Sequence, residues 1–92
     1  METIAVIGAG MMGPGIAQVF AAHGHPVDVY ARTAEKIATV KARVRTNLTR
    51  MADYGLVESS DISPILDRIA VTTELPLALR RSNVVIEPIT ED

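Results

Sequence analysis

The sequence predicts an α/β fold built on a parallel β-sheet, and three observations carry this prediction. Short runs rich in valine and isoleucine alternate with segments of helical periodicity along the whole chain. The apolar runs are continuous, which is typical of parallel strands covered by helices on both faces. A glycine-rich turn joins the first apolar run directly to the first helical segment. Right-handed crossovers then predict about four strands in the spatial order 3-2-1-4.

The first predicted strand, Ile4–Ile7, leads directly into the sequence Gly8-Ala9-Gly10-Met11-Met12-Gly13. In this GxGxxG pattern, Gly8 permits a sharp turn, Gly10 lets a pyrophosphate approach the backbone, and Gly13 lets the next helix pack closely on the sheet. The free N–H groups at the start of that helix attract phosphate. The pattern therefore predicts a dinucleotide site in an incomplete, Rossmann-like doubly wound sheet. A glycine turn that serves packing alone is the alternative.

The next segments complete a βαβ unit and add a long helix. The first helix, residues 15–23, is expected to end at Gly24, and residues 27–30 form the second strand. From Thr33, a predicted N-cap, apolar residues recur at three- and four-residue steps and indicate an amphipathic helix over residues 34–54. Its polar face carries the basic residues Lys36, Lys41, Arg43, Arg45 and Arg50.

The rest of the chain supplies two more strands. A short helix through residue 66 precedes the third strand at 69–73, and a brief helix at 75–81 precedes the fourth strand at 83–87. In such a sheet the cofactor binds outside the carboxyl ends of strands one and four. The polar residues expected there are Glu87, Thr90 and Glu91.

Composition narrows the class of protein without naming a function. The 92 residues suffice for one small domain, with 48% hydrophobic residues and a net charge of −2. No basic excess is present to attract nucleic acid or an acidic membrane surface. The chain has no cysteine, which excludes disulfides and thiolate zinc sites. The N-terminus lacks the basic start of a signal peptide and no apolar stretch approaches a membrane span, so we expect a cytoplasmic protein.

The residues that begin the chain also resemble a known family. The sequence from Ile4 to Gly13, followed by Gly15-Ile16-Ala17-Gln18, is similar to the start of the 3-hydroxyacyl-CoA dehydrogenases. The long basic helix, the Thr72-Thr73 pair and the Val84-Val85-Ile86-Glu87 run followed by Glu91 fall where that family has counterparts. The resemblance covers essentially all of the chain.

This resemblance implies an NAD-linked oxidoreductase of fatty acid metabolism, which interconverts an L-3-hydroxyacyl-CoA and its 3-oxo form. By position, Gly10 to Gly13 hold the pyrophosphate, with Met11 and Met12 touching the cofactor. Glu91 matches an acidic residue near the nicotinamide half, with an ordinary solvated carboxylate as the alternative. On the long helix, Asn47 and Tyr54 fall near positions that contact CoA in the family, although a lysine often found at the latter is absent.

One departure from the family concerns the choice of cofactor. The family carries an acidic residue for the adenosine ribose at the end of strand two, where this chain has Ala31. Asp28 lies three residues earlier, roughly 10 Å short of the ribose. Loss of the carboxylate and the presence of Arg32 make NADP compatible with the site. NAD is still favoured over NADP, because an arginine also follows the acidic residue in many family members that use NAD.

A second departure concerns catalysis. The resemblance implies a catalytic His activated by a Glu, with Ser and Asn positioning the thioester, beyond the matched region. The histidines His23 and His25 fall at the helix-to-strand corner away from the cofactor and are interpreted as surface or capping residues. We therefore expect no catalytic residue or metal site in residues 1–92. They form the N-terminal part of a dinucleotide-binding domain, inactive alone, without the substrate-binding and helical dimerising parts of a homodimeric enzyme.

Two other functions stay open beside the dehydrogenase. An NADP-linked reductase of another 3-hydroxy acid is favoured if Ala31 and Arg32 surround a 2′-phosphate. A non-catalytic nucleotide-binding module is favoured if strand four, apolar on both faces, is a stable sheet edge.

Overall fold

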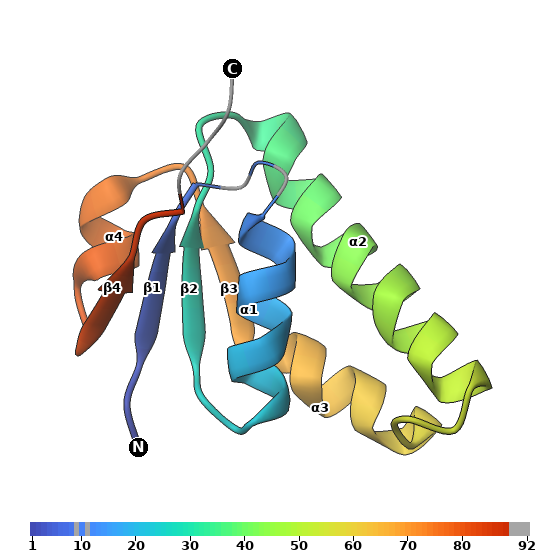
Figure 1. The fold of residues 1–92 in the computed structure, drawn as a ribbon. Coiled ribbons are helices and arrows are strands. Elements are labelled where there is room, and N and C mark those ends of the chain that lie inside the picture. The colour runs from blue at the N-terminus through green and yellow to red at the C-terminus, as the bar shows by residue number, and fades with distance from the viewer. Residues whose placement is uncertain (9, 11, 89–92) are drawn as a thin grey trace.

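The fold is a four-stranded parallel sheet flanked by helices, as shown in Figure 1. The computed structural model describes residues 1–8, 10 and 12–88. The strands are β1 (Ile4–Ile7), β2 (Val27–Tyr30), β3 (Ile69–Thr72) and β4 (Val84–Ile86). The helices are α1 (Gly13–Ala22), α2 (Ala34–Asp53), α3 (Ile62–Asp67) and α4 (Leu75–Leu79), with a 3-10 turn at Ser59–Asp61. All strand pairs are parallel and the order is β3-β2-β1-β4, which confirms the predicted topology.

The hydrophobic core lies between the sheet and the helices α1, α2 and α3. Residues in register on neighbouring strands, such as Ile4, Val27 and Ile69, lie on the face that these helices cover. On α2, Val40, Val44 and Leu48 are fully buried at four-residue steps. Each buried aliphatic side chain contributes about 1.5–3 kcal/mol relative to an exposed one. The core therefore holds α1 and α2 firmly over the strands that end at the glycine turn.

The ends of the elements follow local chemistry. Helix α1 begins two residues earlier than expected, because Pro14 fits a first helical turn, where its missing N–H has no intrahelical partner. The Thr33 hydroxyl caps α2 by accepting a hydrogen bond from the backbone N–H of Lys36 at 3.4 Å. The start of β4 is tied to the N-terminus, since Thr3 N–H donates to the Asn83 Oδ1 at 3.0 Å.

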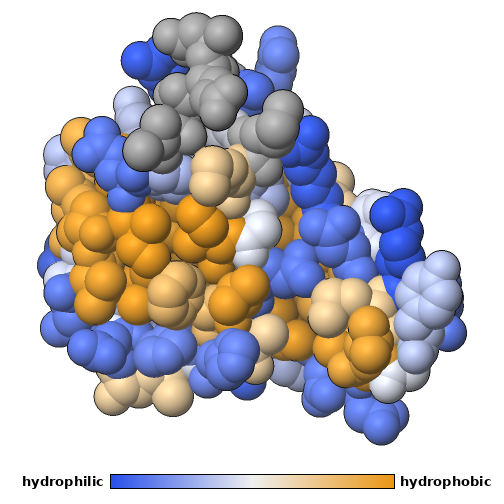
Figure 2. All heavy atoms as spheres, in the orientation of Figure 1, coloured by the Kyte–Doolittle hydropathy of each residue, from blue (hydrophilic) through white to orange (hydrophobic). Residues whose placement is uncertain are grey.

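The second face of the sheet is covered by one short helix, which is less than the sequence predicted. Helix α4 contacts β1, β2 and β3 there, and it buries only Ala78 of its own residues. Val85 on β4 is 53% exposed, together with Leu75, Leu77 and Leu79 on α4. Figure 2 shows the apolar surface gathered over α4 and β4. The sequence led us to expect strand four, apolar on both faces, as a sheet edge, and β4 lies at the edge of the sheet while α4 contacts β1, β2 and β3.

An ion pair joins Arg81, two residues after the end of α4, to the centre of this face. Asp28 in β2 is 6% exposed and accepts two hydrogen bonds from Arg81, Nε to Oδ2 at 2.8 Å and Nη2 to Oδ1 at 3.0 Å. The hydrogen bond to Asp28 raises the pKa of Arg81 above its ordinary value. Stability gained from a raised pKa is complete below the ordinary pKa and is lost only as the pH rises through the raised value. The pair therefore stays intact through the neutral range.

Substitution of Arg81 tests this ion pair. Arg81→Ala leaves the buried Asp28 carboxylate without its partner, and we expect a loss of about 2 kcal/mol in the free energy of unfolding. Arg80→Ala, at an exposed neighbour, is the matched control and is expected to change stability by less than ~0.5 kcal/mol. Adding Asp28→Val to Arg81→Ala should restore part of the loss, because no buried charge remains. Urea denaturation measures all three, and equal curves for the two single variants would contradict the assignment.

Candidate functional site

The candidate site is the turn that leaves β1 at its carboxyl end. Gly8 has φ +125°, a backbone conformation that residues with a Cβ rarely adopt. Its N–H donates to the Tyr30 carbonyl oxygen at 3.0 Å, which joins the turn to the end of β2. Gly10 is half-buried within the turn. The first residue of the turn is therefore tied to the end of β2.

Gly13 sets how closely α1 approaches this turn. It is buried, and a Cβ added to it would run into the carbonyl oxygen and carbon of Gly8. The backbone of the first helical turn thus lies directly against the backbone that leaves the strand. This is the close helix–strand contact for which the third glycine of a dinucleotide-binding turn is needed.

The start of α1 is open to a ligand. Met12 occupies the N-cap position, is 54% exposed, and no side chain caps the helix there within the described residues. The first N–H groups of a helix lack intrahelical acceptors, and they carry the positive end of its dipole. Phosphate oxygens are the natural partners for such groups. Two residues predicted for the site, Met11 and Glu91, lie outside the described residues, as does Thr90.

The turn lies at the switch point of the sheet. β1 is between β2 and β4, and the chain connections go to opposite faces on its two sides. In Figure 1 the turn and the carboxyl ends of β2 and β4 meet at one edge of the sheet. Ligands of open parallel sheets bind at this kind of crevice. Glu87, which follows β4, is exposed at this edge.

Ala31 and Arg32 follow β2 and are the two residues expected to select between NAD and NADP. They differ in exposure. Ala31 is fully buried, and its N–H donates to the Thr72 carbonyl oxygen at 2.8 Å. The Ala31 methyl group has no exposed surface that could contact a ribose. Arg32 is exposed beside it. Asp28 is held by Arg81 on the α4 side of the sheet, in keeping with the expectation that it does not serve the ribose.

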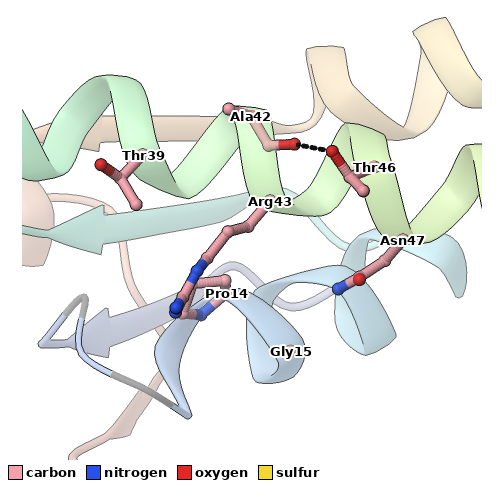
Figure 3. Close-up of a pocket in the computed structure, with 7 residues that line it drawn as sticks. All are labelled: Pro14, Gly15, Thr39, Ala42, Arg43, Thr46 and Asn47. Atoms are coloured by element: carbon pink, nitrogen blue, oxygen red, sulfur yellow. Dashed lines mark hydrogen bonds between the residues drawn. The ribbon is translucent and has the colours of Figure 1, made fainter.

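A cleft of about 460 Å³ lies beside the turn, between α1 and α2. Its lining residues are Pro14, Gly15, Thr39, Ala42, Arg43, Thr46 and Asn47. In Figure 3 the Arg43 side chain extends from α2 toward Pro14. Asn47 also points to α1 and donates from Nδ2 to the Gln18 Oε1 at 3.2 Å. Tyr54, the other sequence candidate on this helix, is 76% exposed and is not among the lining residues.

Of the residues that line this cleft, the family resemblance pointed to Asn47, and a signal for the others was present in the sequence. Thr39, Arg43, Thr46 and Asn47 recur at three- and four-residue steps, which places them along one polar side of α2. The spacing between α1 and α2, on which the cleft depends, is a property of the packed core.

The histidines lie at the opposite edge of the sheet. The Nδ1 atom of His23 is 2.8 Å from the Val19 carbonyl oxygen. The Nδ1 atom of His25 is 2.9 Å from the Glu2 carbonyl oxygen. Both contacts belong to the corner between α1 and β2, at the amino ends of the strands. Across residues 1–8, 10 and 12–88, no group of three His, Cys, Asp or Glu is arranged to hold a metal ion. No helix in the described part of the chain is long and apolar enough to cross a membrane.

Comparison with known proteins identifies a family that matches almost the whole chain. The family model described as "3-hydroxyacyl-CoA dehydrogenase, NAD binding domain" matches residues 3–92. The 3-hydroxyadipyl-CoA dehydrogenase of Escherichia coli K12 is 34% identical over 91 residues, which are 99% of this chain and 19% of that protein. The human mitochondrial hydroxyacyl-coenzyme A dehydrogenase is 32% identical over 97 residues, covering 100% of this chain and 31% of that protein.

Solved structures agree with the sequence comparison. The crystal structure of (S)-3-hydroxybutyryl-CoA dehydrogenase from Ralstonia eutropha has a TM-score of 0.91 and 30% sequence identity, covering 100% of this chain and 32% of that one. The chain therefore spans between about a fifth and a third of the length of these proteins.

Alanine substitutions at two glycines of α1 test the geometry of the turn. Gly13→Ala is expected to lower the free energy of unfolding by about 2–3 kcal/mol, because its Cβ meets the backbone of Gly8, which cannot rotate away. Gly15→Ala is the matched control: nothing lies within 4 Å of its added Cβ, and alanine favours a helix by about 1 kcal/mol over glycine. Thermal unfolding of both variants measures the difference. Equal stability of the two would show that α1 does not depend on this contact.

Proposed function

Because the chain belongs to the family of NAD-binding domains of 3-hydroxyacyl-CoA dehydrogenases, we propose that it binds the nicotinamide cofactor of such an oxidoreductase. The whole activity proposed is hydride transfer between an L-3-hydroxyacyl-CoA thioester and the cofactor. The observation that carries the proposal is the contact of Gly13 with the Gly8 carbonyl at the switch point of the sheet. It brings the uncapped start of α1 to the edge where dinucleotides bind.

Each part of the site has a distinct task in this proposal. The backbone from Gly10 to Gly13 binds the pyrophosphate. The end of β2, at Ala31 and Arg32, faces the adenosine half, and the end of β4, at Glu87, faces the nicotinamide half. The bound nicotinamide supplies the hydride acceptor or donor. The chain itself contributes binding and orientation, which set the position of the reacting ring relative to a substrate.

We infer that the chain alone does not catalyse the reaction. Oxidation of a hydroxyl group requires a base for its proton, and both histidines of the chain lie at the far edge of the sheet. By resemblance to the family, the acid/base group of the proposed reaction is a histidine beyond residues 1–92. In this proposal those residues are the N-terminal part of the cofactor domain of a homodimeric enzyme. A cytoplasmic location stays a prediction, since relatives include mitochondrial proteins.

The cleft between α1 and α2 supports acyl-CoA as the substrate class. It opens beside the cofactor turn and presents the exposed Arg43 guanidinium near Pro14, with Asn47 further along α2. An arginine pairs readily with phosphate groups, which coenzyme A carries. Relatives named for hydroxyacyl-CoA and hydroxybutyryl-CoA substrates agree with this assignment.

NADP is the second cofactor that the site admits. Family membership favours NAD. However, the position that carries an acidic residue in NAD sites is Ala31 here, and Arg32 beside it is exposed. An NADP-linked reductase acting on another 3-hydroxy acid is therefore the alternative function.

A charge reversal at the start of α1 tests dinucleotide binding. Met12→Glu places a carboxylate beside the expected pyrophosphate and should weaken NADH and NADPH about tenfold or more through like-charge repulsion. Val19→Glu is the matched control, because Val19 has the same 54% exposure and lies on the same helix away from the turn. Nicotinamide fluorescence measures binding, and circular dichroism verifies that each variant is folded. If neither nucleotide binds to the folded wild-type chain, the proposed function is wrong.

A further inference from the structure

The end of β2 lies next to the cofactor turn. Ile7 of β1 is in register with Tyr30 of β2, and the N–H of Gly8 donates to the Tyr30 carbonyl oxygen at 3.0 Å. Residues 31 and 32 therefore follow β2 at the edge where the turn begins. In a dinucleotide site of this kind, the adenosine ribose lies at the end of the second strand. The residues after Tyr30 are those that meet the ribose 2′ position.

No carboxylate of β2 reaches this position. Ala31 is fully buried and has no polar side-chain atom. The carboxylate of Asp28 is buried on the other face of the sheet, where Arg81 binds both of its oxygens. A ribose with a free 2′-hydroxyl thus loses the hydrogen bonds that an acidic residue gives it in NAD sites. The repulsion that such a residue exerts on a 2′-phosphate is lost as well.

Three exposed groups suited to phosphate follow Ala31. Arg32 offers a planar guanidinium, Thr33 offers a hydroxyl, and Lys36 offers an ammonium group one helical turn later. Thr33 and Lys36 are held together, because the Lys36 N–H donates to the Thr33 carbonyl oxygen at 3.1 Å and contacts its hydroxyl at 3.4 Å.

The charge of this segment is available to a ligand. Within residues 1–8, 10 and 12–88, the salt bridge of the structure is Arg81 with Asp28, so Arg32 and Lys36 have no described carboxylate partner. Glu35 is the acidic neighbour in the same turn of α2, which leaves residues 32–36 with a net positive charge.

We propose that Arg32, Thr33 and Lys36 form a site for the 2′-phosphate of NADP, and that the chain prefers NADP to NAD. The proposal rests on the dinucleotide binding proposed above and names the cofactor for that same site. Arginine binds phosphate through two parallel charge-assisted hydrogen bonds, and the lysine adds a second cation. NAD brings no group that could use either charge at this position, since its 2′ substituent is a hydroxyl.

The test compares NADPH and NADH on the purified chain and on charge variants. NADPH is expected to bind about tenfold more tightly than NADH, and Arg32→Ala should abolish this difference by weakening NADPH alone. Lys36→Ala should reduce the difference in the same direction. Arg45→Ala, an exposed arginine on α2 away from the turn, is the matched control and should leave both affinities unchanged. Substitution at the exposed Arg32 is preferred to Ala31→Asp, because Ala31 is fully buried and a carboxylate there would also perturb folding.

The outcomes separate this inference from the proposed function. Equal affinities for the two nucleotides, a preference for NADH, or an Arg32→Ala variant that behaves as Arg45→Ala would overturn the NADP site while dinucleotide binding stands. Failure of the folded wild-type chain to bind either nucleotide would overturn both. Competition by 2′,5′-ADP but not by 5′-ADP, lost in Arg32→Ala, would support the 2′-phosphate as the recognised group.

Discussion

The packing of Gly13 against the carbonyl group of Gly8 is the constraint on which the other features of the site depend. It brings the backbone of α1 onto the end of β1 and leaves no room for a side chain between them. From that position α1 presents its open first turn at the sheet edge, and its second half packs against β2 and α2. The spacing between α1 and α2, on which the cleft depends, is set by the core that both helices share. The contact of Gly13 with Gly8 therefore determines the position of the backbone that we propose to bind phosphate.

The two faces of the sheet are stabilised by different interactions. On one face, aliphatic side chains of three helices pack on valine and isoleucine residues of the strands. On the other face, α4 is short, and the half-exposed Arg81 that follows it pairs with the buried Asp28 of the central strand β2. A paired and hydrogen-bonded charge is tolerated inside a protein, whereas an unpaired one is costly. The ion pair therefore helps to fix the position of α4 on this face, where the helix makes few apolar contacts.

Much of the fold was predictable from sequence, and part of the site was not. The periodicity of the apolar residues, together with Gly24 and Thr33, predicted the strands, the helices and their order along the chain correctly, because these signals are local. The role of Gly13 followed from its place in a strand–turn–helix context. The Asp28 to Arg81 pair joins residues 53 positions apart, and the α1–α2 cleft depends on the distance between two packed helices. The complete burial of Ala31 likewise depends on how β2 and β3 end against each other. Such features arise from tertiary packing, which no local pattern encodes.

The pairing of the first strand with the last has a consequence for synthesis on the ribosome. Thr3 and Asn83, 80 residues apart, exchange hydrogen bonds at the start of β1 and β4. During translation β1 can align with β2 early, but its other edge stays open until residues 84–86 have left the exit tunnel. Contacts of such long sequence separation form late and slow the folding of a domain. The edge of β1 that faces β4 is therefore the last part of the described sheet that can pair during synthesis.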